Sequence, residues 1–193
     1  YDTIQAQEGL EAGYDSECMI FQCGANTTVR WIGNENGYAA KNTWSKSNVN
    51  VEADTCDDNM QGSYSLGYED GNKWTVPEAD ARITSGWFWG PNKSTPKTIT
   101  DLGNMYFNSI GHNAPLLLNV PPNTDGTVDQ EILDRLAEFG ANISETFADN
   151  LAAQAVVGAT SVRGNDTASA RQMSWMAATI HTGRRMTALH PAR

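Results

Sequence analysis

The run Pro115-Leu116-Leu117-Leu118-Asn119-Val120 decides the fold class of this chain. Its apolar residues do not alternate with polar ones, which is typical of a strand covered on both faces in a parallel sheet. Pro121 and Pro122 end the run, because proline cannot donate to a strand ladder. Asn119 is expected to cap the end of the strand.

A helix is predicted on each side of this strand. Upstream, Thr100 is a candidate N-cap for a helix that runs to Ile110 with Leu102 and Met105 on one face. Downstream, Thr127 and Gln130 match a capping box. They precede a long helix whose apolar stripe runs from Ile132 to Phe147.

Three shorter apolar segments predict further strands, at 19–21, 29–32 and 86–89. Residues 33–80 keep no periodicity and are predicted to form a long functional loop. This order of elements predicts an α/β architecture, either a doubly wound sheet or a (β/α)8 barrel. A complete barrel needs about 250 residues, so residues 1–148 predict only the C-terminal half of one, truncated at the N-terminus.

Composition excludes several classes of partner. The net charge of −10 argues against nucleic acid, and no apolar run is long enough for membrane insertion. Six tryptophans among many Asn, Asp and Gly residues favour carbohydrate binding. Cys18, Cys23 and Cys56 are an odd number at unmatched spacings, so free thiols are predicted rather than a disulfide framework or a zinc site. We expect no metal and no cofactor.

Four segments together resemble the α-L-fucosidases of glycoside hydrolase family 29. They are Val29–Tyr38, Trp74–Asp80, Arg82–Phe88 and Gly111–Pro122, and their order and spacing also fit that family. The form Arg30-Trp31-Ile32-Gly33-Asn34-Glu35 is most similar to the subfamily that cleaves α-1,3/1,4-linked fucose. The partner that this resemblance implies is a fucosylated oligosaccharide or glycoconjugate.

The resemblance implies a (β/α)8 barrel and a retaining mechanism, in which an Asp attacks the anomeric carbon and a Glu serves as acid and then base. Glu35 matches the acid/base. Such an acid must keep its proton near neutral pH, which burial against an aromatic neighbour favours, and Trp31 is the candidate neighbour. Trp87, Trp31 and Asn34 are the predicted substrate-binding residues, with Trp87 either a wall for the C6 methyl of fucose or an ordinary core aromatic.

Other polar residues are predicted to have structural roles. Outside its motif, Glu35 itself would be an ordinary solvated carboxylate. Glu78 and Asp80 are either solvated loop acids or residues that bind hydroxyls or order the site, and structural roles are preferred for both. His112 is expected to be a hydrogen-bonded histidine. Asp57 and Asp58 lack the ligand spacing of a calcium loop and indicate a solvated acidic loop.

The 34 residues before Glu35 contain no match to the nucleophile motif of the family. We therefore expect the chain to be part of a larger secreted or cell-surface protein, and to be inactive by itself. Two alternatives stay open: a non-catalytic carbohydrate-binding protein built on a decayed barrel, and a different barrel glycosidase.

The end of the chain changes character twice. Residues 149–167 are predicted to be a linker and the first strand of a β-sandwich, because 156–166 resembles the opening of a discoidin-like carbohydrate-binding module. Residues 168–193 contain four Arg and no Asp or Glu, and a shifted reading frame of plausible codons for 171–187 resembles a continuation of that module. A frameshift near Ala168 and an irregular, disordered tail are therefore predicted.

Overall fold

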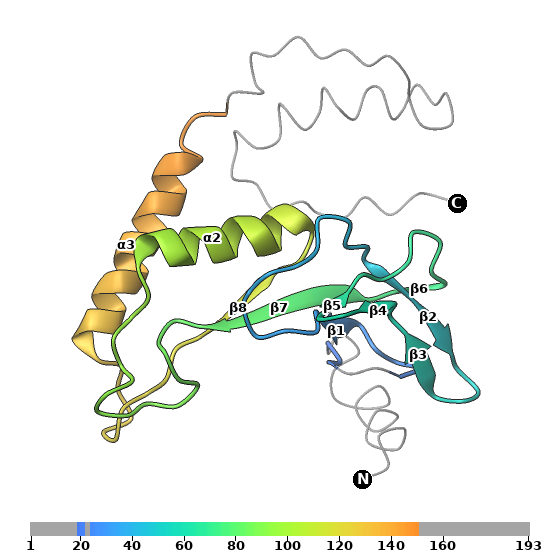
Figure 1. Cartoon of the computed structure of the whole chain (residues 1–193), viewed down its shortest axis with the longest axis horizontal. Helices are drawn as coiled ribbons and strands as arrows, with labels where there is room; N and C mark the ends of the chain where they lie inside the picture. The colour runs from blue at the N-terminus through green and yellow to red at the C-terminus, as the bar shows by residue number, and fades with distance from the viewer. Residues whose placement is uncertain (1–18, 22–23, 151–193) are drawn as a thin grey trace, which may run out of the picture. The chain divides into compact units, whose positions relative to one another are not determined.

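The computed structural model describes residues 19–21 and 24–150 (Figure 1). The chain divides into two units, residues 1–139 and 140–193, which are considered separately. The described elements, in chain order, are β1 (Val29–Trp31), β2 (Lys46–Asn50), β3 (Thr55–Asp57), β4 (Met60–Gln61), β5 (Tyr64–Ser65), β6 (Lys73–Trp74), β7 (Val76–Arg82), α2 (Ile99–Ser109), the 3-10 turn η1 (Ile110–His112), β8 (Leu116–Asn119) and α3 (Gln130–Thr146).

A three-stranded parallel sheet in the order β1-β7-β8 organises the first unit. Trp31 of β1 lies opposite Glu78 of β7, and Asp80 of β7 lies opposite Leu117 of β8. The strands predicted at 29–32 and 115–120 are confirmed as β1 and β8, and the α/β class is confirmed for this part. The central strand β7 was not predicted, and the strand predicted at 86–89 is wrong, because residues 86–88 form bends after β7 and residue 89 is in no strand.

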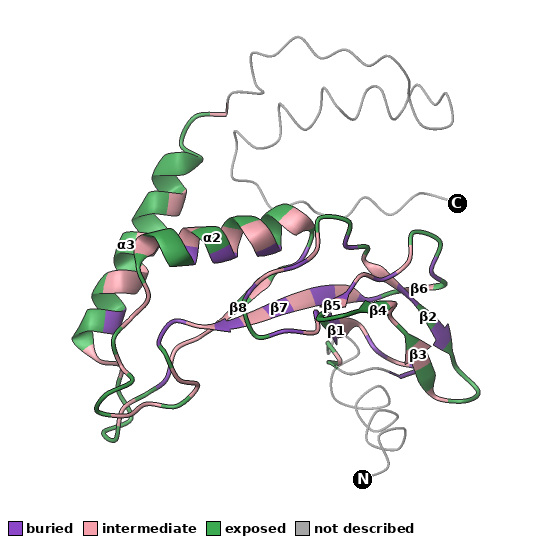
Figure 2. Ribbon diagram, viewed as in Figure 1, coloured by how far each residue is buried: buried purple, intermediate pink, exposed green. Residues whose placement is uncertain are grey.

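The two faces of the sheet differ in cover. Residues alternate along β7 between buried and partly exposed (Figure 2). The covered face holds Ala81 and Ile83, which pack with Leu102 and Met105 of α2 and with Ile132 of α3. On the opposite face Leu117 is 53% exposed, so the prediction that β8 is covered on both faces is wrong for the described residues.

Helix α2 connects β7 to β8 and lies along the covered face of the sheet (Figure 1). Its N-cap is Thr98, not the predicted Thr100. The Thr98 hydroxyl accepts a hydrogen bond from the Asp101 backbone N–H, and the Asp101 carboxylate accepts one from the Thr98 N–H, forming a capping box. The buried face predicted for this helix, with Leu102 and Met105, is confirmed.

Helix α3 begins at Gln130, later than the predicted cap at Thr127 implies. The Thr127 hydroxyl instead donates to the Asn123 side chain, 3.1 Å away, within the turn after β8. The Asp129 carbonyl accepts from the N–H groups of Ile132 and Leu133 at the helix start. The second unit contributes the end of α3 and residues up to 150 to the described part.

Residues 46–74 are not the structureless loop that the sequence predicted. They form an antiparallel sheet in the order β3-β2-β6 and a separate β4-β5 hairpin. Their strands are two to five residues long, which is too short for a periodic signal. Cys56 in β3 is disulfide-bonded, so the prediction of a free thiol is wrong at this position. The other two cysteines lie outside the described residues.

The segment at 19–21 forms a single parallel bridge, from Phe21 to Val29, rather than the predicted buried strand. Met19 and Phe21 are 61% and 54% exposed, since they lie on the uncovered face. The predictions for 151–193, which include most of the linker, the module strand and the tail, fall outside the described residues. No helix within the described ranges is both long and apolar enough to span a membrane.

Candidate active site

Three loops meet at the carboxyl edge of the parallel sheet. They follow β1, β7 and β8, and carry Glu35, Trp87 and Asn123 respectively. Two side-chain hydrogen bonds connect the β7 loop to its neighbours at this edge. The Trp87 indole N–H donates to Glu35 Oε2 over 2.8 Å, and Asn119 Nδ2, at the end of β8, donates to the Trp87 carbonyl over 2.9 Å. Residues separated by more than 50 positions in the sequence are thus brought within one hydrogen bond of each other.

Glu35 is exposed at this edge, with one carboxylate oxygen held by Trp87. The indole N–H is a donor only, so this hydrogen bond fixes the orientation of the carboxyl group. Trp31, the neighbour expected from sequence, does not make this contact, because alternation along β1 places its side chain on the uncovered face of the sheet, where its indole N–H donates to Asp80. The structure therefore brings together two of the four predicted site residues, Glu35 and Trp87.

Trp87 is held from two sides. The guanidinium carbon of Arg82 lies 5.5 Å from the centre of the indole ring, within cation–π range, and Asn119 anchors the backbone. Arg82 Nε is buried and has no hydrogen-bond partner in the described part of the chain. Lys97 Nζ connects the end of the loop after β7 to its start, by donating to the carbonyls of Arg82 and Thr84 at 2.6 and 2.7 Å. Burial, followed by repulsion from Arg82, lowers the pKa of Lys97.

The loop that carries Glu35 is fixed by its own asparagine. Asn34 is buried, its Nδ2 donates to the carbonyls of Tyr38 and Ser63 at 2.9 and 3.1 Å, and its Oδ1 accepts from the Asn36 N–H at 3.0 Å. The Ser65 N–H also donates to the Ile32 carbonyl at 2.7 Å. The β4-β5 hairpin thus supports the turn before Glu35. These bonds give Asn34 a positioning role, and its contact with substrate stays a prediction.

Arg30 fastens the same hairpin to β1. Its side chain is 1% exposed and makes five donor contacts. Nε donates to the Ser65 hydroxyl at 2.7 Å, one terminal nitrogen to the Thr75 carbonyl and hydroxyl, and the other to the carbonyls of Trp44 and Ser65. Burial lowers the pKa of Arg30 to about 10, opposed by attraction from Asp58, so the guanidinium keeps its charge at neutral pH.

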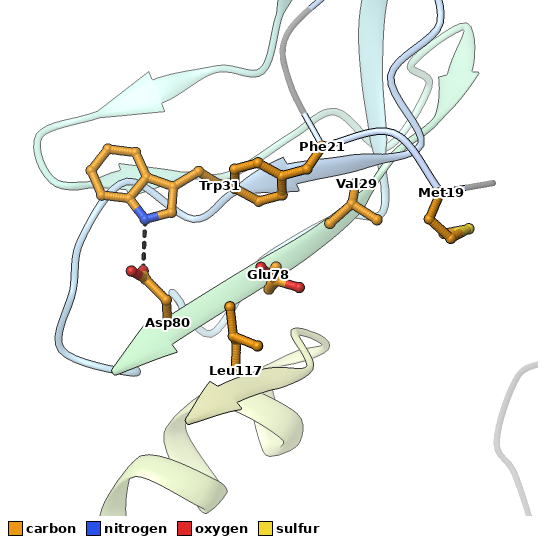
Figure 3. A pocket seen from close by; sticks show the side chains of 7 residues that line it. All are labelled: Met19, Phe21, Val29, Trp31, Glu78, Asp80 and Leu117. Atoms are coloured by element: carbon orange, nitrogen blue, oxygen red, sulfur yellow. Dashed lines mark hydrogen bonds between the residues drawn. The ribbon is translucent and has the colours of Figure 1, made fainter. Parts of the chain in front are cut away.

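The uncovered face of the sheet forms a hollow of about 640 Å³ (Figure 3). Within it the Trp31 indole N–H donates to Asp80 Oδ1 over 2.7 Å, which agrees with the ordering role expected for Asp80. Glu78 lies on the same strand two residues earlier. Burial, and secondly repulsion from Asp80, raises the pKa of Glu78. The other lining residues are Met19, Phe21, Val29 and Leu117.

A further tryptophan of the β7 loop also binds a carboxylate. The Trp89 indole N–H donates to Asp129 Oδ2 over 2.7 Å, joining this loop to the start of α3. Hydrogen bonds from Asn123 and then Trp89 lower the pKa of Asp129. Neither Trp89 nor Arg82 was predicted to be a site residue, although the aromatic cluster Trp87-Phe88-Trp89 is a visible signal for a binding loop.

The remaining predicted polar residues are accounted for by local contacts. The His112 ring lies 2.7 Å from the Ala39 carbonyl through Nδ1, which confirms a hydrogen-bonded histidine. Asp57 accepts from the Tyr68 hydroxyl at 2.7 Å, and this bond, together with one from the Asn59 N–H, lowers the pKa of Asp57. Residues 19–21 and 24–150 contain no group of three acidic, His or Cys side chains placed to hold a metal ion.

Active sites of parallel α/β folds lie at the carboxyl edge of the sheet, and Glu35 and Trp87 meet at this edge. Comparison with known proteins then indicates the family. A family model described as alpha-L-fucosidase matches residues 14–146. Alpha-L-fucosidase 1 of Arabidopsis thaliana is 38% identical over 155 residues, which are 77% of this chain and 29% of the plant protein.

Solved structures agree with the sequence match. A Ruminococcus gnavus GH29 fucosidase in complex with fucose is 62% identical, with a TM-score of 0.72 over 80% of this chain and 30% of that one. A structure named SpGH29 is 34% identical, with a TM-score of 0.69 over 79% of this chain and 32% of that one. The chain belongs to the alpha-L-fucosidase family, and it spans about 30% of the length of these relatives.

Proposed function

We propose that the protein to which this chain belongs is a retaining α-L-fucosidase that releases terminal α-linked fucose from glycans. The observation that carries the proposal is the Glu35–Trp87 pair, which places a carboxyl group at the edge of the sheet where active sites of such folds lie. Membership of the family supports the same substrate class. The R. gnavus relative was solved with fucose bound.

In this proposal Glu35 acts twice. It first gives a proton to the glycosidic oxygen while an aspartate attacks the anomeric carbon, so that the C–O bond breaks and a fucosyl-enzyme ester forms. It then takes a proton from water, which attacks the same carbon and releases fucose and the free aspartate. The two carboxyls would lie about 5–5.5 Å apart, as in retaining enzymes. The aspartate belongs to a part of the protein outside this chain.

The architecture proposed for the whole catalytic domain is a (β/α)8 barrel, of which this chain forms the C-terminal half. Two observations support this architecture. The three strands are parallel and have helices on one face, and the opposite face is uncovered and carries Trp31, Glu78 and Asp80. In a closed barrel that face would point inward. Trp31 and Trp87 are proposed to contact the sugar, and Asn34 to hold the loop or contact it.

The acid/base assignment is tested in the full-length protein with Glu35→Ala. On an unactivated fucosylated oligosaccharide we expect kcat to fall about 10²- to 10⁴-fold, as for loss of a general acid. The matched control is Glu52→Ala, an exposed glutamate, which should leave kcat unchanged. Undiminished fucose release by Glu35→Ala would refute the assignment. Fucose binding without hydrolysis by the wild type would favour a non-catalytic binding protein.

Two further assays define the substrate and the active unit. Faster hydrolysis of aryl galactoside than of aryl fucoside would indicate a different barrel glycosidase. We expect the 193-residue chain alone to be inactive on aryl α-fucoside, because it supplies Glu35 without the nucleophile, and turnover by it would contradict this proposal. The Arg30–Glu35 motif supports a preference for α-1,3/1,4 linkages, which isomeric fucosylated trisaccharides would test.

We propose a secreted or cell-surface location for the parent protein. The disulfide at Cys56 supports it, because disulfides persist in oxidising compartments. Recovery of the full-length protein from the medium, rather than the cell lysate, is the expected result. We also propose that residues 149–167 are a linker and the first strand of a carbohydrate-binding module, followed by a frameshift near Ala168. Sequencing of the gene on both sides of codon 168 tests the frameshift, and an uninterrupted frame shared with relatives through Arg193 would exclude it.

A further inference from the structure

Arg82 and Asn119 are the last residues of β7 and β8, and they lie opposite each other in the register of the parallel sheet. Both residues contact Trp87. The guanidinium carbon of Arg82 lies 5.5 Å from the centre of the indole ring, and Asn119 Nδ2 donates to the Trp87 carbonyl over 2.9 Å. The pair that ends the two strands therefore holds both the ring and the backbone of this tryptophan.

Strand alternation determines the face of the sheet on which Arg82 lies. Residues of β7 alternate between partly exposed and buried, and Arg82 shares its place in this alternation with Glu78 and Asp80. Successive side chains of a strand point to opposite faces, so Arg82 belongs to the uncovered face, at the carboxyl end of the strand. Active-site residues of parallel α/β folds lie at such strand ends. Arg82 thus lies at the edge where Trp87 meets Glu35.

Trp87 couples this cation to the carboxyl group of Glu35. Rotation about the side-chain bonds of Trp87 would carry its N–H away from Glu35 Oε2, which it reaches over 2.8 Å. A cation over an indole face is attracted by the ring quadrupole, so Arg82 favours the ring orientation in which the N–H meets the carboxyl group. Because the indole N–H can only donate, the proton that Glu35 gives must occupy a lone pair that the indole does not. This hydrogen bond therefore determines which way the acid faces.

We propose that Arg82 is a positioning residue for the reaction: its guanidinium packs on Trp87, and through that ring it orients Glu35 for proton transfer to the leaving oxygen. This inference deepens the proposed function and rests on it. The role requires no contact between Arg82 and the substrate, so it is distinct from fucose binding. Loss of Arg82 should slow the reactions that need the acid, and it should cost no more than loss of the Trp87 N–H itself.

The test compares Arg82→Met with the wild type in the full-length protein, on a neutral fucosylated trisaccharide and on α-L-fucosyl fluoride. The trisaccharide needs a proton on its leaving oxygen, whereas fluoride leaves as an anion. Methionine fills a gap of similar size without the charge. On the trisaccharide kcat/KM should fall about 3- to 10-fold, within the range of one cation–π contact. On the fluoride it should stay within about twofold of the wild type, which also reports an intact fold.

A double-mutant cycle separates action through Trp87 from a general structural role. In the Trp87→Phe background, which lacks the N–H, Arg82→Met should change kcat/KM on the trisaccharide by no more than about twofold. Arg82→Lys keeps a cation and should recover most of the activity. The matched control is Arg135→Met. Arg135 donates to the Lys97 carbonyl at the end of the same loop, and its loss should change the rate on neither substrate.

An unchanged rate of Arg82→Met on the trisaccharide, an equal loss on both substrates, or additive losses in the cycle would overturn the inference. If the wild type cleaves neither substrate, the proposed function fails instead, and NMR of isotope-labelled protein tests the contact directly. The indole N–H resonance of Trp87, identified by its absence in Trp87→Phe, should move in Arg82→Met toward its position in Glu35→Ala, where the hydrogen bond is absent. A resonance that does not move in that direction would refute the role of Arg82.

Discussion

Replacement of Arg30 by methionine should release the β4-β5 hairpin that supports the turn before Glu35. Methionine fills a similar volume, so the cavity left behind is small. The change removes the guanidinium donors to the carbonyls of Trp44, Ser65 and Thr75. At about 1 kcal/mol for each carbonyl left without its donor, the local opening free energy should fall by about 3 kcal/mol. Similar losses are measured when a buried charged network is broken.

Amide hydrogen exchange in residues 59–66, measured by mass spectrometry, reports this opening locally. A loss of about 3 kcal/mol corresponds to exchange roughly 100-fold faster. Arg30→Lys should lie between, because lysine has three donors and no planar fork. Lys41→Met, at an exposed lysine, is the control and should leave the rates unchanged. Exchange accelerated less than threefold in Arg30→Met would show that the guanidinium does not hold the hairpin.

Three further changes test other parts of the structure. Trp87→Phe keeps an aromatic ring but removes the hydrogen-bond donor to Glu35, so kcat of the full-length protein should fall about tenfold while KM stays within twofold of the wild type. The control Trp74→Phe, at an exposed tryptophan of β6, should change neither constant. Glu78→Gln should raise the free energy of unfolding in urea at pH 7, because the pKa of Glu78 is raised in the folded state and its ionisation therefore opposes folding. This stabilisation should vanish below the ordinary pKa of about 4.3, where the carboxyl group is protonated in both states. A stabilisation that persists at acid pH would contradict this cause. Gly67→Ala should lower the free energy of unfolding by more than Gly62→Ala, since both have positive φ but only a Cβ at Gly67 would come within 2.6 Å of two carbonyl oxygens; equal losses in urea melts would exclude the steric contribution.

The central strand β7 shows why part of the fold was missed from sequence. A buried parallel strand is expected to be a continuous apolar run, and β8 fits that pattern. In β7 the covered face carries Pro77, Ala79 and Ala81, while Glu78 and Asp80 occupy the other face. Small residues allow close approach of the strand to its cover, but they give a weak apolar signal, and the two acids made the segment resemble a loop. Buried and more exposed residues do alternate along β7, but the buried residues are too small to give a clear hydrophobic pattern.

Of the predicted site residues, Glu35 and Trp87 are brought together by the structure, but the hydrogen bond between them was not predicted. The motifs single out Glu35 and Trp87, yet the aromatic neighbour expected for Glu35 was Trp31. Alternation in β1 places Trp31 on the uncovered face, in register with Glu78 and bonded to Asp80. The actual neighbour depends on the path of a loop more than 50 residues later, which no local pattern encodes. The disulfide at Cys56 was missed for a similar reason, since pairing depends on spatial proximity.

Three hydrogen bonds join an indole to a carboxylate on the strands of the parallel sheet and in the loops that follow them. The pairs are Trp31–Asp80, Trp87–Glu35 and Trp89–Asp129. Indole emission responds to the charge of a group bound to its N–H. Tryptophan fluorescence should therefore report protonation of the carboxylates in these pairs. An acid titration followed by fluorescence, with each tryptophan replaced in turn, would separate the three signals. The Trp89 signal should persist to the more acidic conditions expected from the lowered pKa of Asp129.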